Sequence, residues 1–220
     1  MSKVRHVSEA APPWGAPVDH ALADLFARGA AMGLVDAHPA GAEPTGGAGM
    51  NRLLKSLQQH GIGGEGARTL TPLLRARSST PLDAGAEQAL AQGLQRLAEA
   101  LEDCAAPAAE WPAMRAVFGD ELLGELLAVS PASLRRYAAA ERSTPQEVAE
   151  RLHWLALVVA DLAGAYNDFG MRRWFERPRS QLGGKSPRQM LGRRWGVDSE
   201  AAVRVRALAS VLRGANPLAA

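Results

Sequence analysis

At four points of this chain a serine or threonine directly precedes a proline at the start of a helix-forming stretch: Thr80-Pro81, Ser130-Pro131, Thr144-Pro145 and Ser186-Pro187. A hydroxyl side chain there caps free N–H groups of the first helical turn, and proline fits the first helical position because it has no N–H to satisfy. Thr144 with Glu147, and Ser186 with Gln189, also have the spacing of a capping box. No segment alternates apolar and polar residues as a strand does, so we predict an all-α fold, a helical bundle.

Apolar spacing locates the helices of the N-terminal part. We predict short helices over 19–32, with Ala21, Leu22, Leu25 and Phe26 inward, and over 51–60, with Leu53, Leu54 and Leu57 inward. Residues 61–80 are expected to be irregular. After Thr80-Pro81, a narrow stripe of Leu90, Leu94, Leu97, Leu101 and Cys104 predicts a helix that packs within this chain or against a second copy. Cys104 is expected to be a small buried residue.

Two longer apolar faces follow in the C-terminal part. Val148, Leu152, Leu155, Val159 and Leu162 predict one long helix after Thr144. A last helix begins near Asp198 and stops at Gly214, with Val203, Ala207, Leu208, Val211 and Leu212 predicted to face inward.

Several function classes find no support in the sequence. The single cysteine excludes an internal disulfide and a cysteine-based metal cluster, and the five histidines are scattered without metal-ligand spacing. Gly184-Lys185-Ser186 resembles the end of a P-loop, but Arg179 stands where that motif needs a glycine. We therefore expect no enzyme activity and no cofactor. Without a signal peptide or an apolar stretch of about 20 residues, we expect a cytoplasmic protein with no membrane contact.

The charge is distributed unevenly along the chain. Residues 1–134 hold 10 Lys/Arg and 15 Asp/Glu, whereas residues 135–220 hold 15 Lys/Arg and 8 Asp/Glu. A basic half of this kind is typical of a surface for nucleic acid or for an acidic partner, although a solvated arginine-rich surface is an equal alternative on charge alone.

Residues 121–139 have the pattern of a helix-turn-helix. A leucine-rich helix is followed by the short turn Val129-Ser130 and by a second helix over 131–139, with Leu134 and Tyr137 inward. In such motifs the start of the second helix enters the major groove of DNA, and arginine there binds guanine or phosphate. The candidate DNA-binding residues are Ser133, Arg135, Arg136, Arg142 and Ser143. The alternative is an ordinary helical hairpin.

The passage from Tyr166 to Pro187 carries the most specific pattern. A helix with Trp174 and Phe175 ends at Pro178, and Leu182-Gly183-Gly184 precedes the Ser186-Pro187 helix start. In this order, together with the upstream helix-turn-helix and a final helix ending in glycine, residues 112–220 resemble the Xre/MbcA/ParS antitoxins.

That resemblance implies a non-catalytic antitoxin that inhibits a RES-type, NAD-consuming toxin and regulates its own operon by binding operator DNA, as a homodimer. Trp174, Leu182 and Pro187 are then a small structural core. The candidate toxin-binding residues are Arg173, Arg177, Gly183, Gly184, Lys185, Arg206 and Arg213. The glycine pair allows positive φ and a close backbone approach. In the related antitoxins the C-terminal helix and tail cover the toxin's cofactor pocket, so removing the residues after Leu212 is expected to spare the fold and weaken inhibition.

The resulting division of the chain has four parts. Residues 1–80 are partly disordered with short helices, 81–111 form the amphipathic, potentially oligomerising helix, 112–164 the Xre-like helix-turn-helix region, and 165–220 the toxin-binding domain. Two alternatives remain open, a stand-alone DNA-binding transcriptional regulator and a non-enzymatic scaffold protein.

Overall fold

The structure, a computed structural model, describes residues 15–36, 47–75 and 83–213. Within these ranges all regular secondary structure is helical, which confirms the predicted all-α fold. The helices are α1 (Ala16–Ala31), α2 (Gly47–Gln59), α3 (Gly64–Arg75), α4 (Ala84–Asp103), α5 (Pro107–Leu127), α6 (Pro131–Ala138), α7 (Gln146–Leu162), α8 (Asp168–Glu176), the 3-10 turn η1 (Ser180–Leu182), α9 (Pro187–Leu191) and α10 (Glu200–Ser210).

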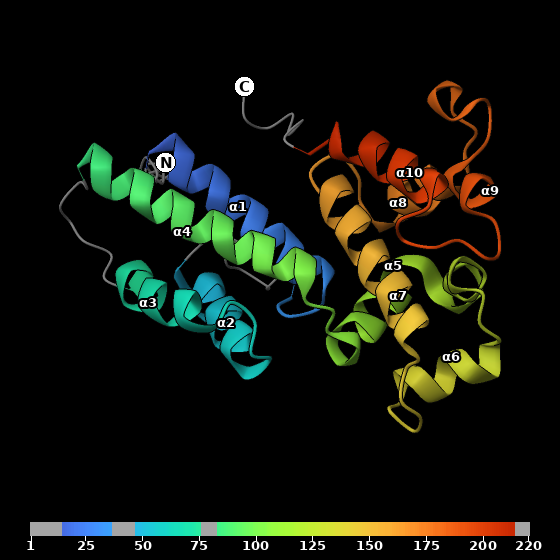
Figure 1. Ribbon diagram of the computed structural model, residues 1–220, viewed down its shortest axis with the longest axis horizontal. Helices are drawn as coiled ribbons and strands as arrows, with labels where there is room; N and C mark the ends of the chain where they lie inside the picture. Colours follow the sequence, from blue (N-terminus) through green and yellow to red (C-terminus); the bar gives the residue numbers. More distant parts are fainter. Residues whose placement is uncertain (1–14, 37–46, 76–82, 214–220) are drawn as a thin grey trace, which may run out of the picture.

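Two groups of helices meet along α7. Figure 1 shows α1 and α4 side by side in one half of the molecule, with α2 and α3 against them. In the other half, α7 packs on α5 and α10, and α1 also reaches α7. The helix α7 is therefore buried on all sides from Arg151 to Leu162, and near its start Val148 and Ala149 are buried while Glu150 is exposed. The five residues predicted for its apolar face are all buried.

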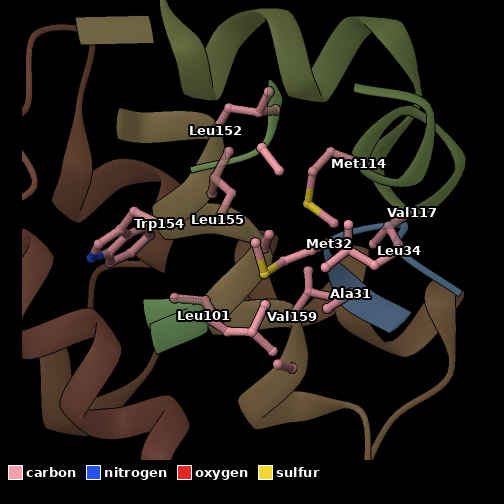
Figure 2. Packing of buried hydrophobic residues seen from close by; sticks show 14 of the residues in the cluster. Ala31, Met32, Leu34, Leu101, Met114, Val117, Leu152, Trp154, Leu155 and Val159 are labelled. Atoms are coloured by element: carbon pink, nitrogen blue, oxygen red, sulfur yellow. The ribbon is translucent and has the colours of Figure 1, made fainter. Parts of the chain in front are cut away.

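One hydrophobic cluster joins the two groups and runs from Val18 to Ala209. Figure 2 shows its centre, where Met32 after α1, Leu101 of α4, Met114 of α5 and Leu155 of α7 converge. The cluster crosses the boundaries at residues 111/112 and 164/165, and the first of these falls within α5. The described helices thus share one core.

In the N-terminal part, two predictions are confirmed and one is wrong. The first two helices form where expected, and Leu22, Leu25, Phe26, Leu53, Leu54 and Leu57 are buried. Residues 64–75, expected to be irregular, form α3, because buried Ala67 and Leu70 give it an apolar face despite the glycines around it. Thr80-Pro81 lies outside the described residues, and α4 is instead capped by Asp83, which accepts a hydrogen bond from Ala86 N at 2.8 Å.

Two further predictions about single residues are wrong. Cys104 is exposed, because α4 ends at Asp103 and the buried stripe ends at Leu101. Thr144 does not cap α7. Its hydroxyl accepts a hydrogen bond from Trp111 Nε1 at 2.9 Å instead.

The inward face of α10 differs in part from its prediction. Leu208 and Leu212 pack against the core as expected, but Ala207 is exposed and Val203 and Val211 are 57% and 76% exposed. Ala202, Val205 and Ala209 are buried instead. Small side chains on the inner face allow α10 to pack on both α7 and α9.

A sharp bend at Gly119 divides α5 into two segments. Its φ of 72° and ψ of 167° are open to glycine alone in practice. Arg115 clamps the bend through two hydrogen bonds to the Asp120 carboxylate, at 2.7 and 2.9 Å. On the other side Arg172 of α8 donates to the carbonyl oxygens of Ala116 and Val117, which the bend leaves without helical partners. Residues 120–127 therefore run in a different direction from residues 107–118.

Candidate nucleic-acid and partner-binding surfaces

Residues 120–138 fold as two short helices joined by a tight turn. The first of these helices, which is the part of α5 after Gly119, ends at Leu127. Ala128 then adopts a left-handed conformation with φ 56°. Ser130 then caps α6, accepting a hydrogen bond from Ser133 N at 3.1 Å, with Pro131 at the first helical position. Ser186 caps α9 in the same manner, with the predicted capping box to Gln189 complete.

The helix α6 is anchored by its inner face. Leu134 is fully buried, and the Tyr137 ring stacks on Trp111 with centroids 6.0 Å apart. Trp111 is in turn held by Thr144. The inner face is thus fixed to the first segment of α5, and the opposite face is left to solvent.

The structure places the candidate DNA-binding residues on or beside that outer face. Arg135, Arg136, Arg142 and Ser143 are exposed. The Arg142 guanidinium lies over the Tyr137 ring, 5.8 Å from its centroid. Ser133 is half-buried, and its hydroxyl accepts a hydrogen bond from Ser130 Oγ at 3.0 Å. The arginines are therefore the better placed of these side chains to reach a ligand.

Arg151 and Trp195 fix the two-helix unit of residues 120–138 to the C-terminal segment. Arg151, 6% exposed, donates from Nε to the carbonyl oxygen of Trp195 at 2.7 Å and from Nη1 to that of Leu127 at 3.4 Å. Trp195 Nε1 donates to the carbonyl oxygen of Leu126 at 2.8 Å. Two carbonyls at the C-terminal end of α5, which have no helical partner, are satisfied in this way.

The segment after α8 closes into a small loop. The backbone N–H of Arg179 donates to the carbonyl oxygen of Lys185 at 3.0 Å, and that of Gly184 donates to the carbonyl oxygen of Arg179 at 2.9 Å. Gly183 and Gly184 have φ values of 65° and 79°, as a left-handed turn requires. A Cβ at either position would meet no atom of the described residues within 4 Å, so no close backbone approach occurs there among them.

Trp174, Leu182 and Pro187 are buried beneath this loop. The Trp174 ring contacts the Phe175 ring. The Arg179 guanidinium lies over the Trp174 ring, 4.7 Å from the centroid of that ring. Among the candidate toxin-binding residues, Arg173, Arg177 and Lys185 are exposed, as are both glycines of the turn. These three cations form no ion pair within the described residues.

The other two candidates, Arg206 and Arg213, lie elsewhere and are engaged within the chain. Arg206 pairs with Glu102 at 3.1 Å, and Arg213 Nε donates to the Asp161 carboxylate at 2.7 Å. Their proposed role in toxin binding stays a prediction. Asp161 is only 2% exposed, so Arg213 supplies the counter-charge of a buried carboxylate. Ending the chain after Leu212 would remove this counter-charge, and on this ground we expect the cut to destabilise the fold.

These pairs belong to a charged cluster between α1, α4, α7 and the C-terminal helix α10 with Arg213 after it. Arg28, 4% exposed, binds Asp24 and Glu102. Burial tends to raise the pKa of the Glu102 carboxyl, but the charges of Arg28 and Arg206 outweigh it and hold that pKa below its ordinary value. The cluster ties α4 to α10 across the junction of the two helix groups.

A buried histidine adjoins this cluster. His153 Nε2 lies 2.9 Å from the carbonyl oxygen of Glu102, which can only accept, so Nε2 carries a proton. Its Nδ1 lies 2.6 Å from Oε1 of Glu110, a residue with no exposed surface. Burial alone would lower the pKa of His153, but the hydrogen bond and charge of Glu110 outweigh it and raise that pKa above its ordinary value.

Sequence reasoning missed both the charged cluster and a pair of surface arginines. Residues 172–194 contain eight arginines and lysines and one carboxylate, Glu176. Within this segment Arg193 and Arg194 are exposed next to buried Trp195. The sequence signal that could have identified this surface pair is the run Arg193-Arg194-Trp195. The buried cluster left no such signal, because its members come from helices far apart in the sequence, such as Arg28 and Glu102, which are 74 positions apart.

Among the described residues, no group of three or more His, Cys, Asp or Glu side chains could hold a metal ion. No helix in the same ranges is long and apolar enough to cross a membrane.

Comparison of the chain with models of known protein families, with curated proteins and with solved structures found no match.

Proposed function

We propose that this chain is an antitoxin of the Xre/MbcA/ParS kind, which binds operator DNA through α6 and a RES-type, NAD-consuming toxin through its C-terminal segment. The observation that carries the proposal is the order of elements along the chain. A helix-turn-helix is followed by a helix bearing buried Trp174, a closed loop with two left-handed glycines, a capped helix and a final helix. The resemblance of residues 112–220 to these antitoxins implies this same order.

The DNA-binding part of the proposal rests on α6. Its N-terminus is capped, its inner face is anchored by Leu134 and Tyr137, and Arg135 and Arg136 project from the opposite side. Arginine donates in a planar fork that matches both the guanine edge and a phosphate. Electrostatic attraction to DNA requires such cations to be free of carboxylate partners, and neither residue has an ion pair in the described part of the chain.

The toxin-binding part rests on Arg173, Arg177 and Lys185. Arg173 and Arg177 lie at the C-terminal end of α8, and Lys185 ends the closed loop of residues 179–185, called here the glycine loop. All three side chains are exposed. A surface of unpaired cations suits a protein that has a pocket for a phosphate-bearing cofactor, because acidic or phosphate-like groups complement it. With Arg206 and Arg213 engaged inside the chain, this loop surface replaces the last helix as the centre of the proposed interface.

A growth-rescue assay tests the toxin-binding part. Cells express the product of the adjacent gene, which the proposal requires to be a RES-type enzyme, together with the full-length chain or with Arg173→Ala/Arg177→Ala/Lys185→Ala. We expect wild type to restore growth and cellular NAD, and the triple variant to lose most of this rescue. The matched control Arg52→Ala/Arg68→Ala/Arg96→Ala removes three exposed arginines from α2, α3 and α4 and should rescue fully.

Two outcomes would contradict the proposal. Full rescue by the triple variant, with co-purification of the enzyme unchanged, would exclude the loop surface. Failure of the wild-type chain to bind that enzyme would exclude the antitoxin function. In the second case a stand-alone DNA-binding regulator is the remaining candidate, because the recognition helix and its free arginines support DNA binding without any toxin.

A further inference from the structure

The turn between α9 and α10 lies against the helix-turn-helix. A cleft of about 670 Å³ separates them, lined on one side by Ala128, Val129, Ser130 and Pro131 and on the other by Arg188 and Arg193. In Figure 1 the chain leaving α9 passes close to the end of α5 before it turns back to α10. The C-terminal segment therefore borders the start of α6.

This turn is held rigidly on the helix-turn-helix. Trp195 is 2% exposed, donates to the carbonyl oxygen of Leu126, and accepts a hydrogen bond from Arg151 through its own carbonyl. Its ring packs on Trp154 with centroids 4.7 Å apart. On the other side of the turn, Arg188 pairs with Glu125 at 2.6 Å. Arg193 and Arg194 are thus placed between two fixed points.

The acidic side chains of this region are largely neutralised within the chain. Asp120 is clamped by Arg115, which holds the pKa of that carboxyl below its ordinary value, and Glu125 is paired with Arg188. Exposed Glu121 and Glu141 remain without ion pairs among the described residues. Against them stand five exposed arginines without ion pairs, Arg135, Arg136, Arg142, Arg193 and Arg194. The outer surface around α6 is therefore net positive, and two of its five cations come from the C-terminal segment.

We propose that Arg193 and Arg194 bind backbone phosphates of the DNA duplex that α6 reads. The inference rests on the proposed DNA binding of α6 and adds a second contact region to it. Contacts to phosphate fix the register and orientation of a protein on the duplex, while contacts to base edges read the sequence. An arginine pair on a rigid turn beside the start of a recognition helix meets the geometric need for such a contact, because that end of the helix lies deepest in the groove.

The experiment measures the salt dependence of DNA binding by the full-length chain. One duplex is the DNA immediately upstream of the gene, and the other is a scrambled duplex of the same composition. Affinities are measured by fluorescence anisotropy over a series of salt concentrations. Each phosphate contact contributes about 0.9 to the slope of log K against log[salt], so Arg193→Ala/Arg194→Ala should reduce the slope by about 2. Binding to both duplexes should weaken by similar factors.

Three variants make the result specific. Arg193→Lys/Arg194→Lys keeps the charge and should keep most of the slope. Arg52→Ala/Arg96→Ala removes one exposed arginine from α2 and one from α4, helices in the other half of the molecule from α6 (Figure 1), and should leave the slope at the wild-type value. Arg135→Ala/Arg136→Ala should reduce the preference for the upstream duplex over the scrambled one, which tests α6 separately.

Each remaining outcome overturns one of the two proposals. A wild-type slope for Arg193→Ala/Arg194→Ala, while the α6 variant loses its sequence preference, overturns the inference and leaves DNA binding by α6 intact. If Arg193→Ala/Arg194→Ala has the wild-type salt slope but no longer rescues growth, the two arginines belong to the toxin interface instead. Wild-type protein that binds neither duplex at any salt concentration overturns DNA binding, and the inference with it.

Discussion

At the scale of the residue, the strongest constraint is the buried pair of His153 and Glu110. Glu110 has no exposed surface, and its Oε2 has no hydrogen-bond partner among the described residues. A buried carboxylate is costly unless a cation neutralises it, and His153 is the side chain that binds it here. His153 Nε2 also donates to the backbone carbonyl oxygen of Glu102 in the last turn of α4. Protonation of His153 at Nδ1 is therefore linked to the burial of Glu110.

This linkage predicts a pH dependence of stability. The pKa of His153 is raised in the folded protein, so its contribution is fully present below the unfolded value of about 6.5 and is lost as pH rises through the folded pKa. The free energy of unfolding, measured by urea denaturation between pH 6 and 9, should fall over that window. His153→Gln should flatten the decline, and His20→Gln, the same change at an exposed position, should keep it. An unchanged decline in His153→Gln would assign it to other groups.

At the scale of the element, helices with a strong local pattern were predicted well. The cap and proline of α6, the capping box of α9 and the apolar face of α7 are local properties, readable within a few residues. The bend at Gly119 was not predicted, because it is stabilised by Arg172, which lies more than fifty positions away. The capping of α7 by Thr144 failed for a related reason, since Trp111 takes its hydroxyl.

The leucine stripe of α4 left two alternatives, a core helix or a contact with a second copy. The structure buries Leu90, Leu94, Leu97 and Leu101 inside the chain, where α4 packs on α1 and α3. Leu94→Ala should therefore lower the free energy of unfolding by about 2–5 kcal/mol, as a cavity in a packed core does. The molar mass in solution, measured by light scattering, should be the same as that of wild type. A variant that changes the mass without losing stability would identify the stripe as an interface.

The inner face of α10 was predicted only in part, because the sequence offers apolar residues on more than one side. Val203 is 57% exposed and Val205 is fully buried, two positions apart on the same helix. Val205→Ser should cost about 2 kcal/mol or more, since it removes packing and buries a hydroxyl. Val203→Ser, the matched control, should stay within about 0.5 kcal/mol of wild type. Equal losses in urea denaturation for the two variants would contradict the observed orientation of α10.

At the scale of the whole molecule, the candidate surfaces depend on contacts that span the chain. Sequence reasoning located α6 and the glycine loop, because each carries its signal within a short segment. It assigned Arg206 and Arg213 to a partner, because their carboxylates Glu102, Asp161 and Asp24 lie on distant helices. A charged side chain on a helix is indistinguishable in sequence from one that pairs with another helix, so only the packing decides.

The same packing predicts that residues 112–220 do not fold as an independent unit. This fragment begins inside α5 and lacks Trp111, which holds Tyr137 of α6, and Glu110, which holds His153 of α7. It also lacks α1 and α4, so apolar side chains of α7 would be exposed to water, and Arg206 and Arg213 would lose Glu102.

The full-length chain should melt in one cooperative transition, measured by circular dichroism. The fragment should lack that transition and should be degraded rapidly by a protease under conditions in which the full chain resists. A fragment that melts cooperatively near the full-length temperature would demonstrate two independent domains, and the shared core would then contribute little to the stability of the C-terminal half.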